Sequence, residues 1–166
     1  MTDLQQPSLG TWAATQRQCL HHRLGNLEQV TTSADEWIAR LDEPPAWLIE
    51  TAMSRSPADA LSALSVCCES FDRDQVSAAL MAAWRDLLDA DPSAEERIAE
   101  ALFFMAAYED DVPSPEAARE MLNFWDALDL ARRGLYGDLD TIRAALRAFL
   151  IRWSDPKFYT GHGKGG

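Results

Sequence analysis

The chain has 166 residues, the size of one domain, and 47% of them are apolar, which is enough to build a buried core. Its formal net charge of −12 disfavours binding to nucleic-acid backbones or to anionic membranes. It begins without the basic and apolar segments of a secretory leader, and no apolar run approaches the roughly 20 residues of a membrane span. Three cysteines, two of them adjacent, do not suggest a disulfide framework. We therefore expect a cytoplasmic protein.

The first half of the chain carries several helix signals in succession. Apolar spacing predicts a helix over residues 9–24. Ser33 followed three residues later by Glu36 has the form of a capping box, which predicts a short helix through Leu41. Because proline is tolerated in the first turn of a helix, the next one is predicted to begin near Pro45.

The start signal is repeated at Ser56, where a good N-cap residue precedes a proline. The helix that follows is predicted to turn four side chains inward: Leu61, Leu64, Cys68 and Phe71. Asp72 is predicted to cap the next helix. The apolar stripe of that helix has the spacing of one α-helical face and comprises Val76, Leu80, Ala83, Trp84, Leu87 and Leu88.

Three more helices are predicted in the second half. Pro92 opens the first of them, and Ser114 with Pro115 opens the second, which stops before Gly134. Asp138 caps the last. The apolar residues in register on these three helices are Ile98, Leu102 and Met105, then Met121, Leu122, Trp125 and Leu128, then Ile142, Leu146, Phe149, Leu150 and Trp153.

These elements predict an all-α fold: a single-domain bundle of about eight helices, packed largely as antiparallel hairpins because the connections are short. The Ser-Pro or Asp-Pro starts at residues 56, 91 and 114 leave a short α-solenoid as an alternative. Residues 1–153 are assigned to the helical domain. Residues 154–166 contain four glycines and are assigned to a flexible tail.

Charge is distributed unevenly along the chain. Residues 1–85 hold 11 acids and 6 bases, residues 86–129 hold 13 acids and 2 bases, and residues 130–166 hold 3 acids and 7 bases. The formal charges of the three segments are therefore −5, −11 and +4. Such an acidic middle segment favours a basic partner and would accelerate its association.

The sequence YEDDVPSPE, residues 108–116, lies within the acidic segment. Three consecutive carboxylates at a helix end splay apart, whereas Ca²⁺ or Mg²⁺ needs oxygens that converge from several directions. Residues 89–100 resemble a calcium-binding EF-hand loop in their acidic positions, but Ala94 stands where that loop needs glycine for its sharp turn. We therefore expect neither a metal nor another cofactor at these positions.

Other catalytic candidates are few. His21 and His22 are adjacent, so they diverge on a helix, while Cys67 and Cys68 fall in a segment predicted to be an apolar helix. Asp129 falls between Leu122 and Trp125 on a helical wheel, on the predicted apolar face. It either pairs with Arg132 or Arg133 or serves as a functional carboxylate in a cleft.

The expected partner-binding surface spans residues 95–126. Phe103 shares a helix side with two glutamates, and if exposed it would form an aromatic anchor surrounded by acids. The full set of candidate residues is Glu96, Glu100, Phe103, Tyr108, Glu109, Asp110, Asp111, Glu116, Glu120 and Asp126.

The chain resembles the small, acidic, single-domain immunity proteins of bacterial toxin systems, and the segment PPAWLIETAMSRSPADAL, residues 44–61, is similar to stretches in such proteins. This resemblance implies a cognate basic toxin as the partner and no catalysis by this chain. It assigns no role to individual residues.

Two alternatives stay open at this point. One is a chaperone or adaptor that holds a secreted protein in a tryptophan-rich groove. The other is a helical ligand-binding or catalytic domain, with Asp129, a cysteine or a histidine in a pocket between helices.

Overall fold

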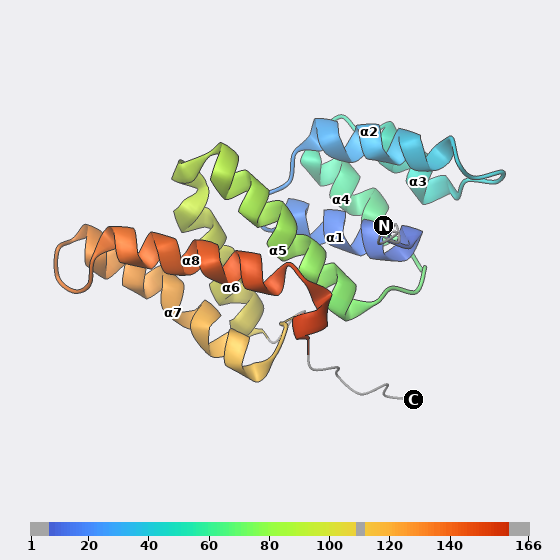
Figure 1. The fold of residues 1–166 in the computed structure, drawn as a ribbon. Coiled ribbons are helices and arrows are strands. Elements are labelled where there is room, and N and C mark those ends of the chain that lie inside the picture. Colours follow the sequence, from blue (N-terminus) through green and yellow to red (C-terminus); the bar gives the residue numbers. More distant parts are fainter. Residues whose placement is uncertain (1–6, 109–111, 160–166) are drawn as a thin grey trace. The chain divides into compact units, whose positions relative to one another are not determined.

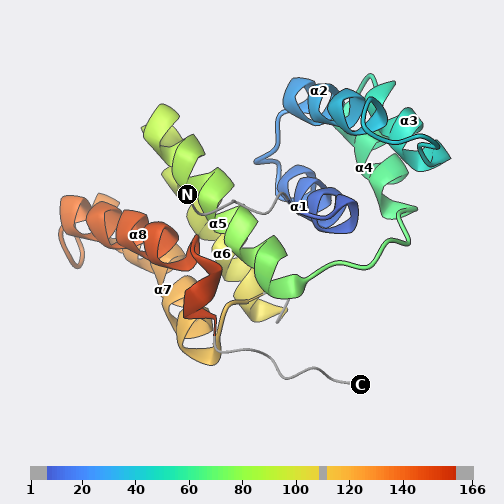
Figure 2. The same cartoon turned by 45° about the vertical axis from the view of Figure 1, so that its right-hand side comes forward.

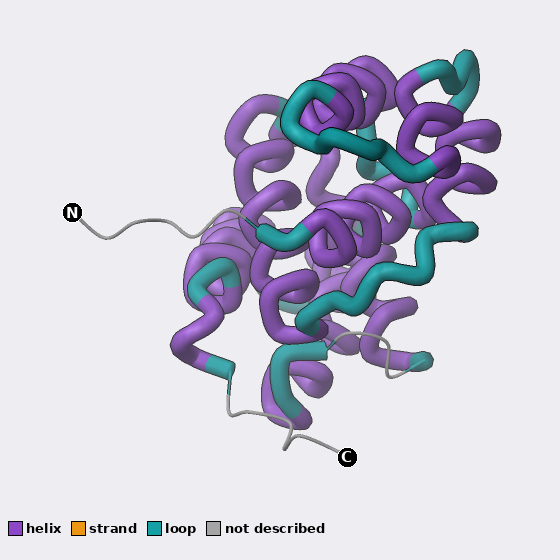
Figure 3. The backbone as a smooth tube through the Cα atoms, turned by 90° about the vertical axis from the view of Figure 1, so that its right-hand side faces the viewer, coloured by secondary structure: helices purple, strands orange, loops and turns teal. Residues whose placement is uncertain are grey.

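A computed structural model describes residues 7–108 and 112–159. Within these ranges the chain forms eight α-helices and two short 3₁₀ helices, with no strand (Figures 1 and 3), so the all-α prediction is confirmed. The α-helices are α1 (Leu9–His21), α2 (Leu27–Ile38), α3 (Ala46–Ala52), α4 (Pro57–Ser65), α5 (Arg73–Ala90), α6 (Glu95–Ala107), α7 (Pro115–Arg132) and α8 (Leu139–Trp153); the 3₁₀ helices are η1 (Pro92–Ala94) and η2 (Pro156–Phe158).

The chain divides into two compact units, residues 1–72 and residues 73–166, which we call the N-terminal and C-terminal units. Helices α1 to α4 belong to the first, and α5 to α8 to the second. The sequence did not predict this division, because the start signal at Asp72 resembles the starts of the other helices.

In the N-terminal unit, α2 pairs with α3, and α4 packs against α1 and α3 (Figure 2). Its core gathers buried side chains from all four helices, including Trp12, Val30, Leu48 and Leu64. At Gly10 a Cβ atom would lie 2.2 Å from the carbonyl oxygen of Ser70, so the absence of a side chain allows the segment after α4 to run close over α1.

The predicted capping box at Ser33 is wrong. Helix α2 begins earlier, at Leu27, where the side chain of Asn26 accepts a hydrogen bond of 2.9 Å from the backbone N–H of Glu28. Ser33 lies inside the helix, and its hydroxyl donates to the carbonyl of Gln29 at 2.8 Å. Serine side chains form this back-bond readily within helices, and it removes Ser33 as a cap.

The prediction that Cys68 and Phe71 turn inward is also wrong. The start of α4 is confirmed, since the hydroxyl of Ser56 accepts from the N–H of Asp59 and Pro57 opens the helix. However, α4 ends at Ser65. Cys68 and Phe71 therefore lie in the connection to α5, where both are exposed.

The C-terminal unit contains the longer helices. Helices α6 and α7 form a hairpin, and α8 runs beside both α5 and α7 (Figures 1 and 2). The predicted starts of α7 and α8 are confirmed, because Ser114 and Asp138 accept backbone hydrogen bonds from the residues three positions later. Gly134, with a φ of +65°, follows the end of α7 as predicted.

Glu95, in the first turn of α6, is a buried carboxylate that joins three helices of this unit. Its exposed fraction is 3%. Arg143 of α8 donates to it through Nε at 2.6 Å and Nη2 at 3.0 Å, and Arg132 of α7 donates through Nη2 at 2.7 Å. The guanidinium of Arg143, followed by that of Arg132, lowers the pKa of Glu95 against the opposing effect of burial.

The packed part of the chain continues past the predicted boundary at residue 153. Tyr159, assigned from sequence to a flexible tail, is buried, and its hydroxyl donates to the carbonyl of Trp153 at 2.8 Å. The two rings meet edge to face with centroids 5.7 Å apart. Burial raises the pKa of the Tyr159 phenol. The segment after α8 is thus fastened to the end of that helix.

Replacing Glu95 by glutamine should reduce the free energy of unfolding by about 2 kcal/mol, because the variant loses charge-assisted hydrogen bonds to two arginines. The matched variant Glu96→Gln, which removes one exposed ion pair, should cost less than about 0.5 kcal/mol. Urea denaturation at neutral pH measures both. Equal costs would show that Glu95 does not hold the unit together.

The stabilisation by Glu95 should also depend on pH. Because its folded-state pKa is lowered, the contribution is present above its unfolded pKa of about 4.3 and is lost as the pH falls through the folded value. The stability difference between wild type and Glu95→Gln should therefore shrink below about pH 4. A difference that stays constant down to pH 3 would contradict the proposed ionisation of Glu95.

Replacing Tyr159 by alanine should cost about 3 kcal/mol of stability, as for other buried aromatic side chains. Phe158→Ala, at the neighbouring exposed ring, should cost less than about 1 kcal/mol. Thermal or urea unfolding of the two variants makes the comparison. Similar small losses would indicate that Tyr159 is not packed in solution.

Candidate partner-binding surface

The candidate residues lie along the α6–α7 hairpin. Glu96, Glu100 and Phe103 are on α6, and Tyr108 is its C-cap residue. The candidates of α7 are Glu116, Glu120 and Asp126. Glu109, Asp110 and Asp111, which follow Tyr108 in the sequence, lie outside the described residues.

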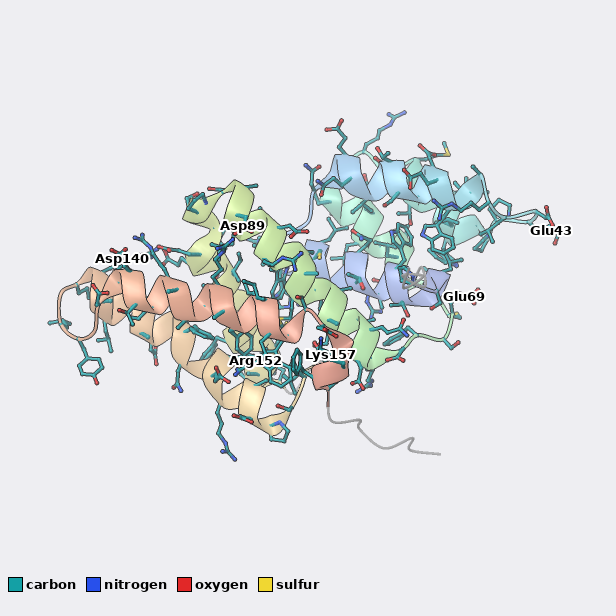
Figure 4. The ribbon with its side chains drawn as sticks, in the orientation of Figure 1. Glu43, Glu69, Asp89, Asp140, Arg152 and Lys157 are labelled. Carbon is teal, nitrogen blue, oxygen red and sulfur yellow. The ribbon has the colours of Figure 1, made fainter. Side chains whose placement is uncertain are left out.

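Several arginines that follow residue 130 in the sequence form ion pairs with acids that precede residue 130. Arg147 of α8 binds Asp89 at the end of α5 through two hydrogen bonds of 2.8 and 3.1 Å. Asp89 is labelled in Figure 4, as is Arg152, which lies further along α8. Arg152 pairs with Glu120 of α7. Together with the contacts of Arg132 and Arg143, these pairs compensate part of the −11 charge of the middle segment within the C-terminal unit.

Compensation divides the candidate acids into two groups. Glu96 is 2.6 Å from Arg132, and Glu120 is paired with Arg152. In contrast, Glu100, Glu116 and Asp126 form no ion pair within the described part of the chain, and all three are exposed. Fewer of the candidate acids are therefore available to a partner than the sequence suggested.

An aromatic cluster lies between α6 and α7, formed by Phe103, Phe104, Tyr108 and Trp125. The ring of Trp125 is 5.2 Å from that of Phe103 and 6.4 Å from that of Phe104. Phe104 and Tyr108 are one helical turn apart, with nearly parallel rings, an interplanar angle of 10° and centroids 6.3 Å apart. Their exposed fractions are 38% and 72%, so two rings of the cluster face solvent while Phe103 and Trp125 are half-buried.

Two of the unpaired acids are close in sequence to members of this cluster, Glu100 on α6 and Asp126 on α7. Glu100 lies one turn before Phe104 on α6, and Asp126 follows Trp125 on α7. At 3.6 residues per turn, Glu116 lies about 180° and Glu120 about 140° around α7 from Trp125. Glu116 and Glu120 therefore lie on other sides of α7 than Trp125. We call Glu100, Phe103, Phe104, Tyr108, Trp125 and Asp126 the acidic–aromatic face.

Sequence reasoning missed Phe104 and the role of Trp125 in this face. Trp125 was assigned to the core because it has the same helical spacing as buried Met121 and Leu128. The signal that could have revealed the face is the spacing Glu100–Phe104–Tyr108, which places an acid and two aromatic residues in one row along α6.

The described residues of the catalytic alternative come from different segments: Asp129 lies on α7, Cys19 and His21 lie on α1, and Cys67 and Cys68 follow α4. Asp129 is half-exposed and pairs with Arg133 at 3.0 Å, as one of its two predicted roles requires. Cys19 is buried and Cys68 is exposed, and burial raises the pKa of the Cys67 thiol, which disfavours a reactive thiolate.

The C-terminal unit contains a pocket of about 450 Å³ between the end of α5, η1 and α8. Its walls carry the Arg147–Asp89 and Arg143–Glu95 pairs, so the carboxylates in it are already bound by guanidinium groups. None of the residues named for catalysis lines it; the lining residues are Leu88, Asp89, Pro92, Glu95, Arg143, Ala144, Leu146 and Arg147.

Comparisons of this chain with protein-family models, with curated proteins and with solved structures found no match. Within the described residues, no helix has the length and apolar character needed to cross a membrane. The same residues contain no group of three or more histidine, cysteine or acidic side chains arranged to hold a metal ion.

Charge reversal should distinguish the two groups of acids by stability. Glu120→Lys should reduce the free energy of unfolding by about 1 kcal/mol, because it replaces an ion pair with repulsion from Arg152. Glu100→Lys, also in a helix interior, should change it by less than about 0.5 kcal/mol. Chemical denaturation of both variants tests this. A larger cost for Glu100→Lys would mean that Glu100 has a structural partner.

Proposed function

We propose that this chain is a binding protein that neutralises a basic protein partner, and that the acidic–aromatic face contacts this partner. The observation that supports it most is the position of Glu100 and Asp126. They are exposed acids of the middle segment that the protein's own bases leave unpaired in its described part. Glu100 lies one turn before the exposed ring of Phe104 on α6, and Asp126 follows Trp125 on α7. Aromatic anchors surrounded by polar residues are typical of binding hot spots.

Among binding proteins, we propose an immunity protein that inhibits a cognate bacterial toxin. Nuclease toxins bind phosphates in basic grooves, and an acidic surface can occupy such a groove. The overall formal charge of −12 would attract the toxin from a distance, while the local face would hold it. This function needs no catalytic group, and its site would be cytoplasmic, where the toxin is made.

The proposal is tested with the purified product of the reading frame adjacent to this one in its genome. The double variant Glu100→Lys/Asp126→Lys should slow association by about tenfold or more, and the association rate of the wild type should fall steeply with salt. Stopped-flow fluorescence measures both quantities.

The matched control is Glu43→Lys/Glu50→Lys in the N-terminal unit. Glu43 lies in the exposed connection between α2 and α3, where Figure 4 labels it, and Glu50 is exposed on α3. Both double variants change the net charge equally, so only a local contact makes the first one slower. Equal effects of the two double variants on the association rate would contradict the proposed surface. Tight binding that does not depend on salt would favour a chaperone.

A further inference from the structure

Within the acidic–aromatic face, no arginine or lysine of the described residues lies over the stacked pair Phe104 and Tyr108. Elsewhere in the protein, aromatic rings are covered by basic side chains: Arg40 lies over Trp37 at 5.6 Å, Arg152 over Trp153 at 5.2 Å and Lys157 over Phe158 at 5.0 Å. In the described part of the chain, no arginine or lysine lies over any ring of the Phe103, Phe104, Tyr108 and Trp125 cluster.

The nearest bases in the sequence are committed elsewhere or make no ring contact. Arg97, in the turn before Glu100, pairs with Asp91 at 3.5 Å, and Arg132, at the end of α7, binds Glu95 and Glu96. Arg119 is exposed on α7, and its guanidinium lies over no ring among the described residues. Within the described chain, the cluster thus combines rings without a cation over them with Glu100, one turn before Phe104, and Asp126, the residue after Trp125, neither of which has an ion-pair partner there.

We infer that this face is a binding site for an arginine side chain of the partner, an inference that rests on the proposed function for the identity of its ligand. A guanidinium is planar, so it can lie against the parallel faces of Phe104 and Tyr108 while its N–H groups donate to Glu100 or Asp126. Lysine carries a compact, strongly hydrated charge that stacks less well on an aromatic ring. The chemistry of the face therefore selects arginine over lysine.

The site can be tested without the partner. The probe is an acetylated and amidated peptide, Gly-Arg-Gly-Arg-Gly, titrated into the ¹⁵N-labelled full chain while the indole N–H signal of Trp125 is followed by NMR. Two matched peptides carry citrulline or lysine in place of arginine. Citrulline retains the planar shape without the charge, so it separates recognition of the cation from contact with the ring.

The arginine peptide should shift the Trp125 signal and reach saturation, with an affinity at least fivefold above those of the citrulline and lysine peptides. Tyr108→Leu should weaken its binding by about fivefold, and Tyr108→Phe, which keeps the ring, should have little effect. The matched control is Tyr136→Leu, since Tyr136 lies in the α7–α8 connection and is 77% exposed, close to the 72% of Tyr108. This control should bind as the wild type does.

The peptide experiment decides the inference. Equal binding of the arginine and citrulline peptides would overturn it, as would equal binding of the lysine peptide or equal losses in Tyr108→Leu and Tyr136→Leu. The partner experiment above decides the proposed function. If charge reversal slows association with the partner while the three peptides bind equally, the acidic surface is supported and the arginine site is wrong. If the arginine peptide binds selectively but charge reversal does not affect the partner, the arginine site is supported and the proposed function is wrong.

Discussion

The ion-paired carboxylate of Glu95 is the contact on which the C-terminal unit depends. A carboxylate that is 3% exposed is stable only if its lost hydration is replaced, and here three hydrogen bonds from two guanidinium groups replace it. Because Arg132 and Arg143 come from different helices, these bonds fix the start of α6 to the end of α7 and to α8. The same two helices, α6 and α7, carry the acidic–aromatic face further along the hairpin.

Ion pairing also changes how the acidity of the chain should be interpreted. Counted along the sequence, residues 86–129 carry −11, but five arginines from residues 132–152 lie against acids of that segment after folding. Each exposed pair stabilises the fold only slightly. Their larger effect is to compensate the acids that they bind and to leave uncompensated charge on the acids that have no arginine opposite in the described chain. A charge-rich segment is thus not equivalent to a charged surface.

The parts of this structure that could be predicted from sequence are those set by local chemistry. Helix starts at Ser56, Ser114 and Asp138 follow from caps that need only their own neighbours in the chain. Asn26 and Ser33 are both acceptable N-cap residues. The helix starts after Asn26, which places Val30 and Ala34 in the core, and this packing is not visible in the local sequence. The burial of Glu95 and the exposure of Phe104 depend on residues 37 and 21 positions away, Arg132 and Trp125, which no local pattern contains.

An aromatic face can receive a partner's cation only if the protein does not supply one itself. An arginine on the same helix would act at a high effective concentration, so it would outcompete any external side chain for the rings and for Glu100. A contact of this kind is present at Trp37, where Arg40, just after the end of α2, lies over the ring. The residues one turn before and after Phe104 on α6 are instead alanine, glutamate and tyrosine, and four of the five arginines of α7 and α8 bind acids. If the face binds an arginine of the partner, as proposed, this pairing does more than stabilise the fold, because within the described chain it leaves Phe104 and Tyr108 without a competing cation.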